Sequence, residues 1–250
     1  MRAVVELLAG AHRLVIFTGA GVSAESGIPT FRDALGGLWA RYDPAALATP
    51  AAFADDPALV WGWYEWRRLK VLGVQPNPAH RAIAALSGRI ADTRLVTQNV
   101  DDLHERAGSR DVLHLHGSLH APRCATCAAA YRDALPDSVE PEEGRRIEPP
   151  RCPACGGQVR PGVVWFGEAL PEAALREAFA AACECDLLLS VGTSGVVQPA
   201  ARIPGLALEH GASVVHVNPQ PVRTRHPREH CLVGPAGEML PELLRRAFPG

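Results

Sequence analysis

The sequence lacks the features that would place it in a membrane or on a nucleic acid. No stretch reaches the roughly 18 apolar residues that a membrane-spanning helix needs. Near the N-terminus, Glu6, His12 and Arg13 interrupt the apolar residues, which is not typical of a signal peptide. The formal net charge of −2 leaves no basic excess for nucleic acid or for an anionic lipid surface. We therefore expect a cytoplasmic protein that binds neither nucleic acid nor membrane.

The cysteines do not suggest disulfide bonds either. There are seven, an odd number, and four of them form two C-x-x-C pairs, which in a reducing compartment indicate a metal. Four thiolates are the ligand set of a tetrahedral structural Zn²⁺ site, and they leave no open position for catalysis. Four buried free cysteines are the alternative, but a segment rich in proline and poor in core residues needs a metal to hold it. The predicted ligands are Cys124, Cys127, Cys152 and Cys155, whereas Cys183, Cys185 and Cys231 are predicted to be core thiols.

Short apolar runs separated by helical patterns, without internal repeats, predict an α/β fold. The architecture that fits is a parallel sheet with helices on both faces, similar to the Rossmann fold. Buried strands are predicted at 14–17, 94–98, 112–115, 186–191 and 213–217, and helices at 2–11, 58–72 and 77–86. The expected division is a large Rossmann-like domain of about 1–36, 78–119 and 160–250, with a small domain from two inserts, a helical one (37–77) and a zinc ribbon (120–159).

A glycine turn directly follows the first predicted strand. Gly19, Gly21 and Ala24 satisfy the pattern G-x-G-x-x-G/A in the context where backbone N–H groups approach a pyrophosphate. The motif alone leaves a purely structural turn open. Pro29 stops any helix here within two turns, and no second strand ending in an acidic residue lies about 20 residues on. The turn thus predicts a dinucleotide site but argues against a hydride-transfer enzyme.

The stretch GAGVSAESGIPTFR (19–32) resembles the characteristic loop of the sirtuins, which are NAD-consuming protein deacylases. The resemblance continues in order along the chain, in TQNVD (97–101), HG (116–117), the two C-x-x-C pairs, VVWFGE (163–168), GTS (192–194) and VN (217–218). It implies that residues 1–250 form a single sirtuin catalytic domain. It further implies NAD as a consumed co-substrate, one structural zinc, acyl-lysine proteins or peptides as substrates, and a monomer.

The resemblance also implies roles for individual residues. His116 would be the general base, which suits an imidazole with an ordinary pKa of about 6.5, and Gly117 would let substrate come close. His114 lies nearby but lacks the adjacent glycine. Asn99 and Asp101 would be the other catalytic residues, at the nicotinamide. The implied NAD-binding residues are Gly19, Ala20, Gly21, Ser23, Ala24, Glu25, Phe31, Arg32, Gln98, Asn99, Asp101, Gly192, Thr193, Ser194, Asn218, Pro219, Gln220 and Ala236.

In the implied reaction, the acyl-lysine oxygen attacks the ribose C1′ as nicotinamide leaves. His116 then takes a proton from a ribose hydroxyl, and water completes the release of deacylated lysine and 2′-O-acyl-ADP-ribose. The segment 163–168 would pair with the substrate backbone as an added strand, through Val163, Phe166, Gly167 and Glu168. From pattern alone a core strand is the alternative.

Tyr64 and Arg67 are three residues apart in a predicted helix and therefore share a face, where they could present a phenol and a guanidinium to a carboxylate. A Tyr-x-x-Arg of this kind resembles the sirtuin branch that removes succinyl and malonyl groups. Ala34 matches the small residue that widens the acyl pocket in that branch, whereas Asp33 departs from its pattern. The resemblance implies a desuccinylase and demalonylase that retains deacetylase activity.

Three alternatives remain open at this point. The chain could be a plain deacetylase without preference for acidic acyl groups, or a protein mono-ADP-ribosyltransferase, which cleaves NAD in the same way. It could also be a zinc-ribbon binding module with an inactive nucleotide fold. The presence of His116, Asn99 and Asp101 together argues against the last alternative.

Overall fold

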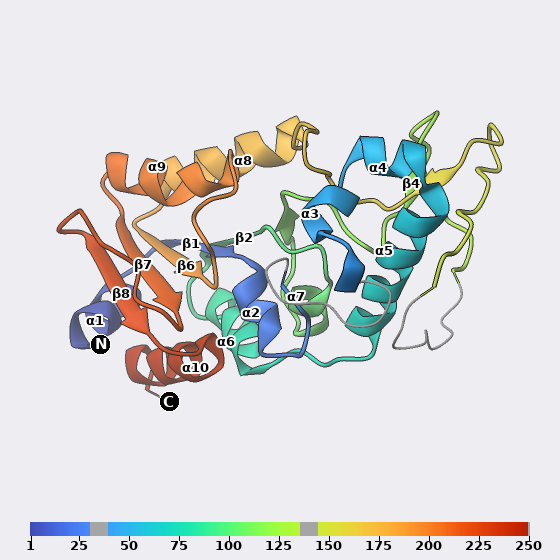
Figure 1. Cartoon of the computed structure of the whole chain (residues 1–250). Helices are drawn as coiled ribbons and strands as arrows, with labels where there is room; N and C mark the ends of the chain where they lie inside the picture. The colour runs from blue at the N-terminus through green and yellow to red at the C-terminus, as the bar shows by residue number, and fades with distance from the viewer. Residues whose placement is uncertain (31–39, 136–144, 250) are drawn as a thin grey trace.

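A parallel sheet of six strands lies at the centre of the larger part of the molecule (Figure 1). The computed structural model describes residues 1–30, 40–135 and 145–249. The strand order is β3-β2-β1-β6-β7-β8, and each neighbouring pair is parallel. The strands are β1 (Arg13–Thr18), β2 (Asp92–Thr97), β3 (Leu113–His114), β6 (Leu187–Val191), β7 (Ser213–Asn218) and β8 (Glu229–Val233). This confirms the predicted α/β class.

Helices cover both faces of the sheet, and the residues of β1 show why its sequence is continuously apolar. Leu14 and Ile16 pack on one side in the core that contains residues of α1, α6 and α10, whereas Val15 and Phe17 pack on the other with α8 and α9. Figure 1 shows the two layers, with α8 and α9 above the sheet and α1, α6 and α10 below it. These helices are α1 (Arg2–Ala9), α6 (Pro78–Ser87), α8 (Glu172–Glu184), α9 (Ile203–Glu209) and α10 (Ala236–Ala247).

A smaller part of the chain lies at the opposite end of the molecule from α1 and α10 (Figure 1). It contains α3 (Pro44–Leu47), α4 (Pro50–Asp55), α5 (Pro57–Leu72) and the antiparallel pair β4 (Arg123–Cys124) and β5 (Val159–Arg160). The helix predicted at 58–72 is therefore present as α5, and the Asp56 side chain caps its start by accepting the N–H of Leu59 at 3.1 Å. The division of the chain into two domains stays a prediction.

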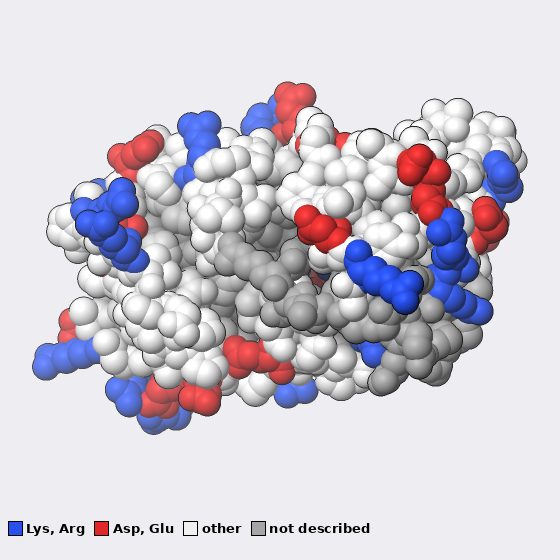
Figure 2. Space-filling model, in the orientation of Figure 1, with Lys and Arg blue, Asp and Glu red and all other residues white. Residues whose placement is uncertain are grey.

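Three short helices complete the described structure. They are α2 (Ala20–Ala24), α7 (Leu103–Arg106) and the 3₁₀ helix η2 (Ala200–Arg202). Helix α2 is short, as the position of Pro29 led us to expect. Among the residues that the structure describes, no helix is long and apolar enough to cross a membrane. On the face shown in Figure 2, Lys and Arg side chains are interspersed with Asp and Glu side chains and do not gather in one patch.

Candidate functional site

Three polar residues meet beyond the carboxyl ends of β1 and β2. The Ser23 hydroxyl donates to Asp101 Oδ2 at 3.0 Å and accepts from Asn99 Nδ2 at 3.0 Å. Asn99 and Asp101 are each only 6% exposed. Burial raises the pKa of Asp101, and hydrogen bonds from the Leu103 N–H and the Ser23 hydroxyl oppose this rise. The structure thus joins three of the predicted site residues in one buried network.

The glycines after β1 lie directly against the loop that follows β6. The Gly19 N–H donates to the carbonyl of Val191, and the Gly21 N–H donates to the carbonyl of Gly192, both at 3.0 Å. A Cβ on Gly21 would come within 2.8 Å of Gly192 Cα. The sequence predicted that these glycines admit a pyrophosphate. The structure adds that they admit a second backbone, which brings the predicted pyrophosphate and adenosine sides together.

The predicted adenosine side lies at the ends of β6 and β7. Asn218 Nδ2 is buried and has no hydrogen-bond partner within the described ranges, which is rare for an amide unless a ligand or water completes it. Ala236 is 3% exposed at the start of α10, and the Thr193 and Ser190 hydroxyls are 2.8 Å apart. Ser194, Pro219 and Gln220 are exposed. The small residues and the unsatisfied amide fit a bound nucleotide.

The other predicted NAD contacts differ in their surroundings. Ala20 and Ala24 are exposed on α2. The Glu25 carboxylate accepts the N–H of Gly237 at 3.1 Å, near the N-terminus of α10, so this side chain connects α2 to α10. Phe31, Arg32 and Ala34 lie outside the described residues, as does Asp33.

The geometry of His116 suits a general base. Its Nδ1 lies 3.0 Å from the carbonyl oxygen of Gln98, an acceptor, so Nδ1 carries the proton and Nε2 keeps its lone pair. Burial lowers the pKa of His116, and the hydrogen bond to Gln98 partly opposes this. Gly117 has φ +74°, and a Cβ there would lie 2.2 Å from the carbonyl oxygen of Gly162, so the close approach of a backbone requires glycine.

His114 has different partners from His116. Its Nε2 lies 2.7 Å from Glu105 Oε1 and its Nδ1 lies 3.0 Å from the Asn99 carbonyl oxygen. Burial alone would lower the pKa of His114, but the Glu105 carboxylate and the Asn99 carbonyl raise it overall. Because both ring nitrogens have partners, His114 is poorly suited to accept a proton from substrate.

The four predicted zinc ligands converge. Their Sγ atoms all lie within 4.8 Å of one another, with 3.5 Å between Cys124 and Cys155 and 3.8 Å between Cys127 and Cys152. A Zn–S bond of about 2.3 Å gives a tetrahedron with edges of about 3.8 Å. The four thiols therefore fit a structural zinc, beside the β4–β5 pair.

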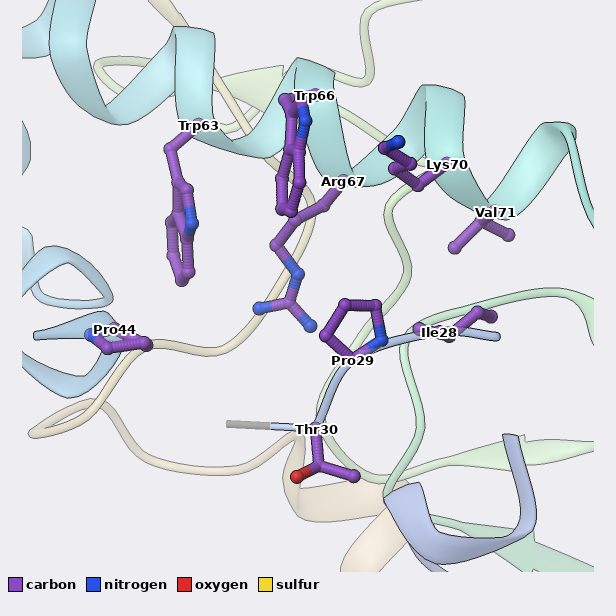
Figure 3. Close-up of a pocket in the computed structure, with 9 residues that line it drawn as sticks. All are labelled: Ile28, Pro29, Thr30, Pro44, Trp63, Trp66, Arg67, Lys70 and Val71. Atoms are coloured by element: carbon purple, nitrogen blue, oxygen red, sulfur yellow. The ribbon is translucent and has the colours of Figure 1, made fainter. Parts of the chain in front are cut away.

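Arg67 lines a pocket between α5 and the segment 28–30 (Figure 3). Its guanidinium extends from the helix toward Pro29 and Thr30, and its Cζ lies 5.0 Å from the centre of the Trp63 ring and 5.9 Å from that of Tyr64. Tyr64 is 3% exposed and does not line this pocket. The pocket residues are Ile28, Pro29, Thr30, Pro44, Trp63, Trp66, Arg67, Lys70 and Val71.

Burial changes the pKa of both residues of the Tyr-x-x-Arg pair. It raises the pKa of Tyr64 to about 12, so the phenol stays neutral and can donate a hydrogen bond. Burial lowers the pKa of Arg67, and electrostatic interactions with Tyr64 and Asp101 oppose this. An anionic ligand beside Arg67 would offset the same desolvation.

The segment 163–168 does not form the core strand that was the alternative for it, and its pairing with a substrate backbone stays a prediction. A single antiparallel bridge joins Val163 to Gly117, and Val163 and Trp165 are 2% and 3% exposed. Phe166, in contrast, is 48% exposed and Gly167 is exposed. The Glu168 carboxylate is bound by Arg160, at 2.5 and 2.8 Å. Phe166 is therefore the most exposed side chain of the segment.

Comparison with known proteins identifies the family. The Sir2 family model matches residues 19–199, which is more than half of the chain. The chain belongs to the Sir2 family. It is 99% identical, over the full length of both chains, to NAD-dependent protein deacylase 1 of Pseudomonas aeruginosa. It is 58% identical to the NAD-dependent protein deacylase of Methylococcus capsulatus, with 98% of each chain covered.

Solved structures of Sir2 proteins share this fold. A complex of a Sir2 homologue with NAD has 45% sequence identity and a TM-score of 0.85, covering 99% of this chain and 93% of that one. A Sir2 protein bound to a myristoylated histone peptide has 34% identity and a TM-score of 0.73, covering 98% of this chain and 95% of that one. The predicted family and the predicted use of NAD are confirmed.

Some polar residues of this Sir2 protein were not found from the sequence. Thr18 and Thr97 are fully buried at the ends of β1 and β2, and their hydroxyls form a 2.8 Å hydrogen bond. Thr97 Oγ1 also accepts the N–H of Asn99 at 3.0 Å, which fixes the backbone of a predicted catalytic residue. Arg160 was missed too. The Thr18–Thr97 contact joins residues 79 apart that only the tertiary fold brings together, so no spacing pattern reveals it.

Proposed function

We propose that this chain, an NAD-dependent protein deacylase, removes succinyl and malonyl groups from lysine side chains and also removes acetyl groups. The observation that carries the acyl preference is the position of Arg67, whose guanidinium lines a mostly apolar pocket beside the predicted active site. A guanidinium that burial disfavours is stabilised by a carboxylate, which it can bind through two parallel hydrogen bonds.

The stem of the acyl group has apolar surfaces to contact in this pocket. Trp63, Trp66 and Pro44 line it together with Arg67, and Figure 3 shows the guanidinium extending away from α5 toward the opposite wall. A succinyl or malonyl group is a short chain that ends in a carboxylate. An apolar wall with an inward-extending guanidinium matches that chemistry, and the second cation of the lining, Lys70, is exposed. An acetyl group needs only the apolar part.

The predicted catalytic roles agree with the geometry of the described residues. When bound, NAD supplies the ribose carbon that receives the acyl oxygen and nicotinamide as the leaving group. Asn99, Asp101 and Ser23 would hold the nicotinamide end through their shared network, and Asn218 would meet the adenosine side. His116 Nε2 would accept the proton, since Nδ1 is held by the Gln98 carbonyl.

Arg67→Met tests the acyl preference. We expect kcat/KM on a succinyl-lysine peptide to fall by at least about tenfold, the loss of a charge-assisted hydrogen bond. The value on the acetyl version of the same peptide should stay within about threefold. Steady-state kinetics with both peptides, with NAD omitted as the blank, provide the measurement.

The matched control is Lys70→Met, which removes an exposed cation from the same helix and the same pocket lining. It should leave both peptides within about twofold of the parent values. An equal loss on both peptides in Arg67→Met would contradict the acyl preference and favour a plain deacetylase. Transfer of ADP-ribose to the peptide, seen as added mass, would instead indicate an ADP-ribosyltransferase.

We also propose that the chain acts as a monomer on acyl-lysine peptides. The support for a monomer is the resemblance of the sequence, and the network, the imidazole and the pocket form without residues of a second copy. The myristoylated histone peptide of the related complex supports an acyl-peptide substrate.

A further inference from the structure

Arg160 is a buried charged residue without a role in the reaction described so far. It ends β5, and it is 8% exposed. The residue before it, Val159, pairs with the zinc ligand Cys124 across the β4–β5 ribbon and is completely buried. The Arg160 backbone is therefore part of the ribbon that the zinc holds together.

The side chain of Arg160 leaves the ribbon and binds the segment 163–168 at three points. Its two terminal nitrogens donate to the two Glu168 oxygens at 2.5 and 2.8 Å, in the bidentate geometry that only arginine offers. Nη2 also donates to the carbonyl of Val163 at 3.2 Å. The guanidinium carbon lies 3.5 Å from the centre of the Trp165 ring, which is a close cation–π contact.

Glu168 also forms a hydrogen bond within its own loop. Its Oε2 also accepts the backbone N–H of Trp165 at 2.8 Å. Burial disfavours the ionised form of Glu168, but the hydrogen bonds from Arg160 and the Trp165 N–H hold its pKa below the usual range. The carbonyl of Val163, the amide of Trp165 and the carboxylate of Glu168 therefore all depend on one guanidinium.

The 163–168 loop contacts the predicted general base, His116, and also the helical residues around Ala48 and Tyr64. The Val164 N–H donates to the carbonyl of His116 at 2.8 Å, and the Phe166 N–H donates to that of Ala48 at 2.9 Å. The Trp165 ring lies 6.4 Å from the Tyr64 ring. Beside these backbone bonds, Arg160 is the charged side chain that contacts Val163, Trp165 and Glu168, on both sides of the exposed Phe166.

We propose that Arg160 is a positioning residue for deacylation: by holding Glu168, Val163 and Trp165, it keeps the 163–168 loop in the conformation that binds the acyl peptide. The inference rests on the proposed deacylase function but not on the acyl preference. An acetyl-lysine peptide is therefore the substrate for the test.

The test compares Arg160→Met, Glu168→Gln and the double variant at saturating NAD. Each single variant should raise the KM for the acetyl peptide about tenfold, because a misplaced loop loses substrate contacts. The double variant should be no more than about twofold worse than either, since both changes remove the same interaction. The kcat, the KM for NAD and the bound zinc should stay within about threefold. Arg160→Lys keeps the charge without the planar fork and should restore only part of the affinity.

Arg151→Met is the matched control, because it removes an exposed arginine from the same ribbon and should change none of these values. An unchanged peptide KM in Glu168→Gln, or a parallel rise of both KM values with loss of zinc, would overturn the proposal. If Arg160→Met does not fold, the peptide KM of Glu168→Gln alone tests the proposal, because this variant keeps the shape of the side chain. Absence of deacylation by the parent chain would instead refute the proposed function.

Discussion

His116 binds the protein backbone through one ring nitrogen, which leaves Nε2 for the proposed proton transfer. The 3.0 Å contact of Nδ1 with the Gln98 carbonyl fixes the tautomer and the direction of the ring. Burial lowers the pKa of His116 below its ordinary 6.5. The imidazole is therefore neutral at pH 7, which is the form that a general base needs.

We predict that the acidic limb of kcat/KM lies below pH 6.5. A base works only when neutral, so activity is lost as the pH falls through its pKa in the free enzyme, and burial has moved that pKa down. The measurement is kcat/KM for an acetyl peptide between pH 5 and 8. A limb above pH 6.5 would contradict the assignment and point to His114, whose pKa is raised.

The sequence was informative about residues whose position along a strand determines their neighbours. His116, Asn99 and Asp101 all follow predicted strands, and the carboxyl ends of parallel strands meet at one edge of the sheet. Arg160 and Glu25 could not be interpreted in this way. Their partners are set by the ribbon and by α10, and no local pattern encodes those contacts.

Two buried histidines join helices α6 and α7 beneath the sheet edge. His80 and His104 are 0% and 1% exposed, and their ring centres are 4.9 Å apart. His80 Nδ1 accepts the Asn77 N–H within the capping box of α6, and His104 Nε2 lies 3.0 Å from the Thr18 hydroxyl. Burial lowers the pKa of His80 to about 4 and that of His104 to about 3, so both are neutral at pH 7.

These histidines predict loss of stability in mild acid. A folded-state pKa below the unfolded value gives stability that is present above the unfolded pKa of about 6.5 and declines as the pH falls toward the folded value. Each histidine then lowers the free energy of unfolding by about 1.4 kcal/mol per pH unit. Urea unfolding between pH 7 and 5 should show a steeper decline in the parent than in His104→Gln. His12→Gln, at an exposed position, is the control. Equal slopes in parent and His104→Gln would contradict the prediction.

Helices and strands could be predicted where a single local signal determines where they begin or end. Asn77 before Pro78 predicted the start of α6, and the structure confirms it with a side-chain cap. Strand β8 was missed, because its residues Glu229 and His230 are polar and only half-buried at the sheet edge. The alternative of a core strand at 163–168 failed for a different reason. Val163 and Trp165 are apolar because they pack in the core cluster that contains residues of α4 and α5, not because they belong to a strand.

At the scale of the whole molecule, the zinc ribbon and the sheet support different parts of the predicted site. The ribbon packs on α5, where Trp61 joins the core of Cys124, Cys152 and Val159, and the Ile147 N–H donates to the Ala58 carbonyl at 3.0 Å. Helix α5 carries Arg67, and the ribbon leads through Arg160 to the 163–168 loop. The predicted nucleotide residues around Gly21, Gly192 and Asn218 instead follow the strands of the sheet.

Removal of zinc should therefore weaken acyl-peptide binding far more than nucleotide binding. Without metal the ribbon loses most of its support, since its hydrophobic cluster is small and structural zinc contributes directly to folding. The sheet keeps its own two cores, which do not include the cysteine ligands. We expect Cys152→Ser, or chelation verified by metal analysis, to raise the KM for an acetyl peptide by at least about tenfold. The Kd for ADP-ribose, measured by calorimetry, should change by less than about threefold. Loss of ADP-ribose binding in step with peptide binding would show that the sheet depends on the ribbon, because a nucleotide site supported by the sheet alone keeps its affinity when the ribbon unfolds.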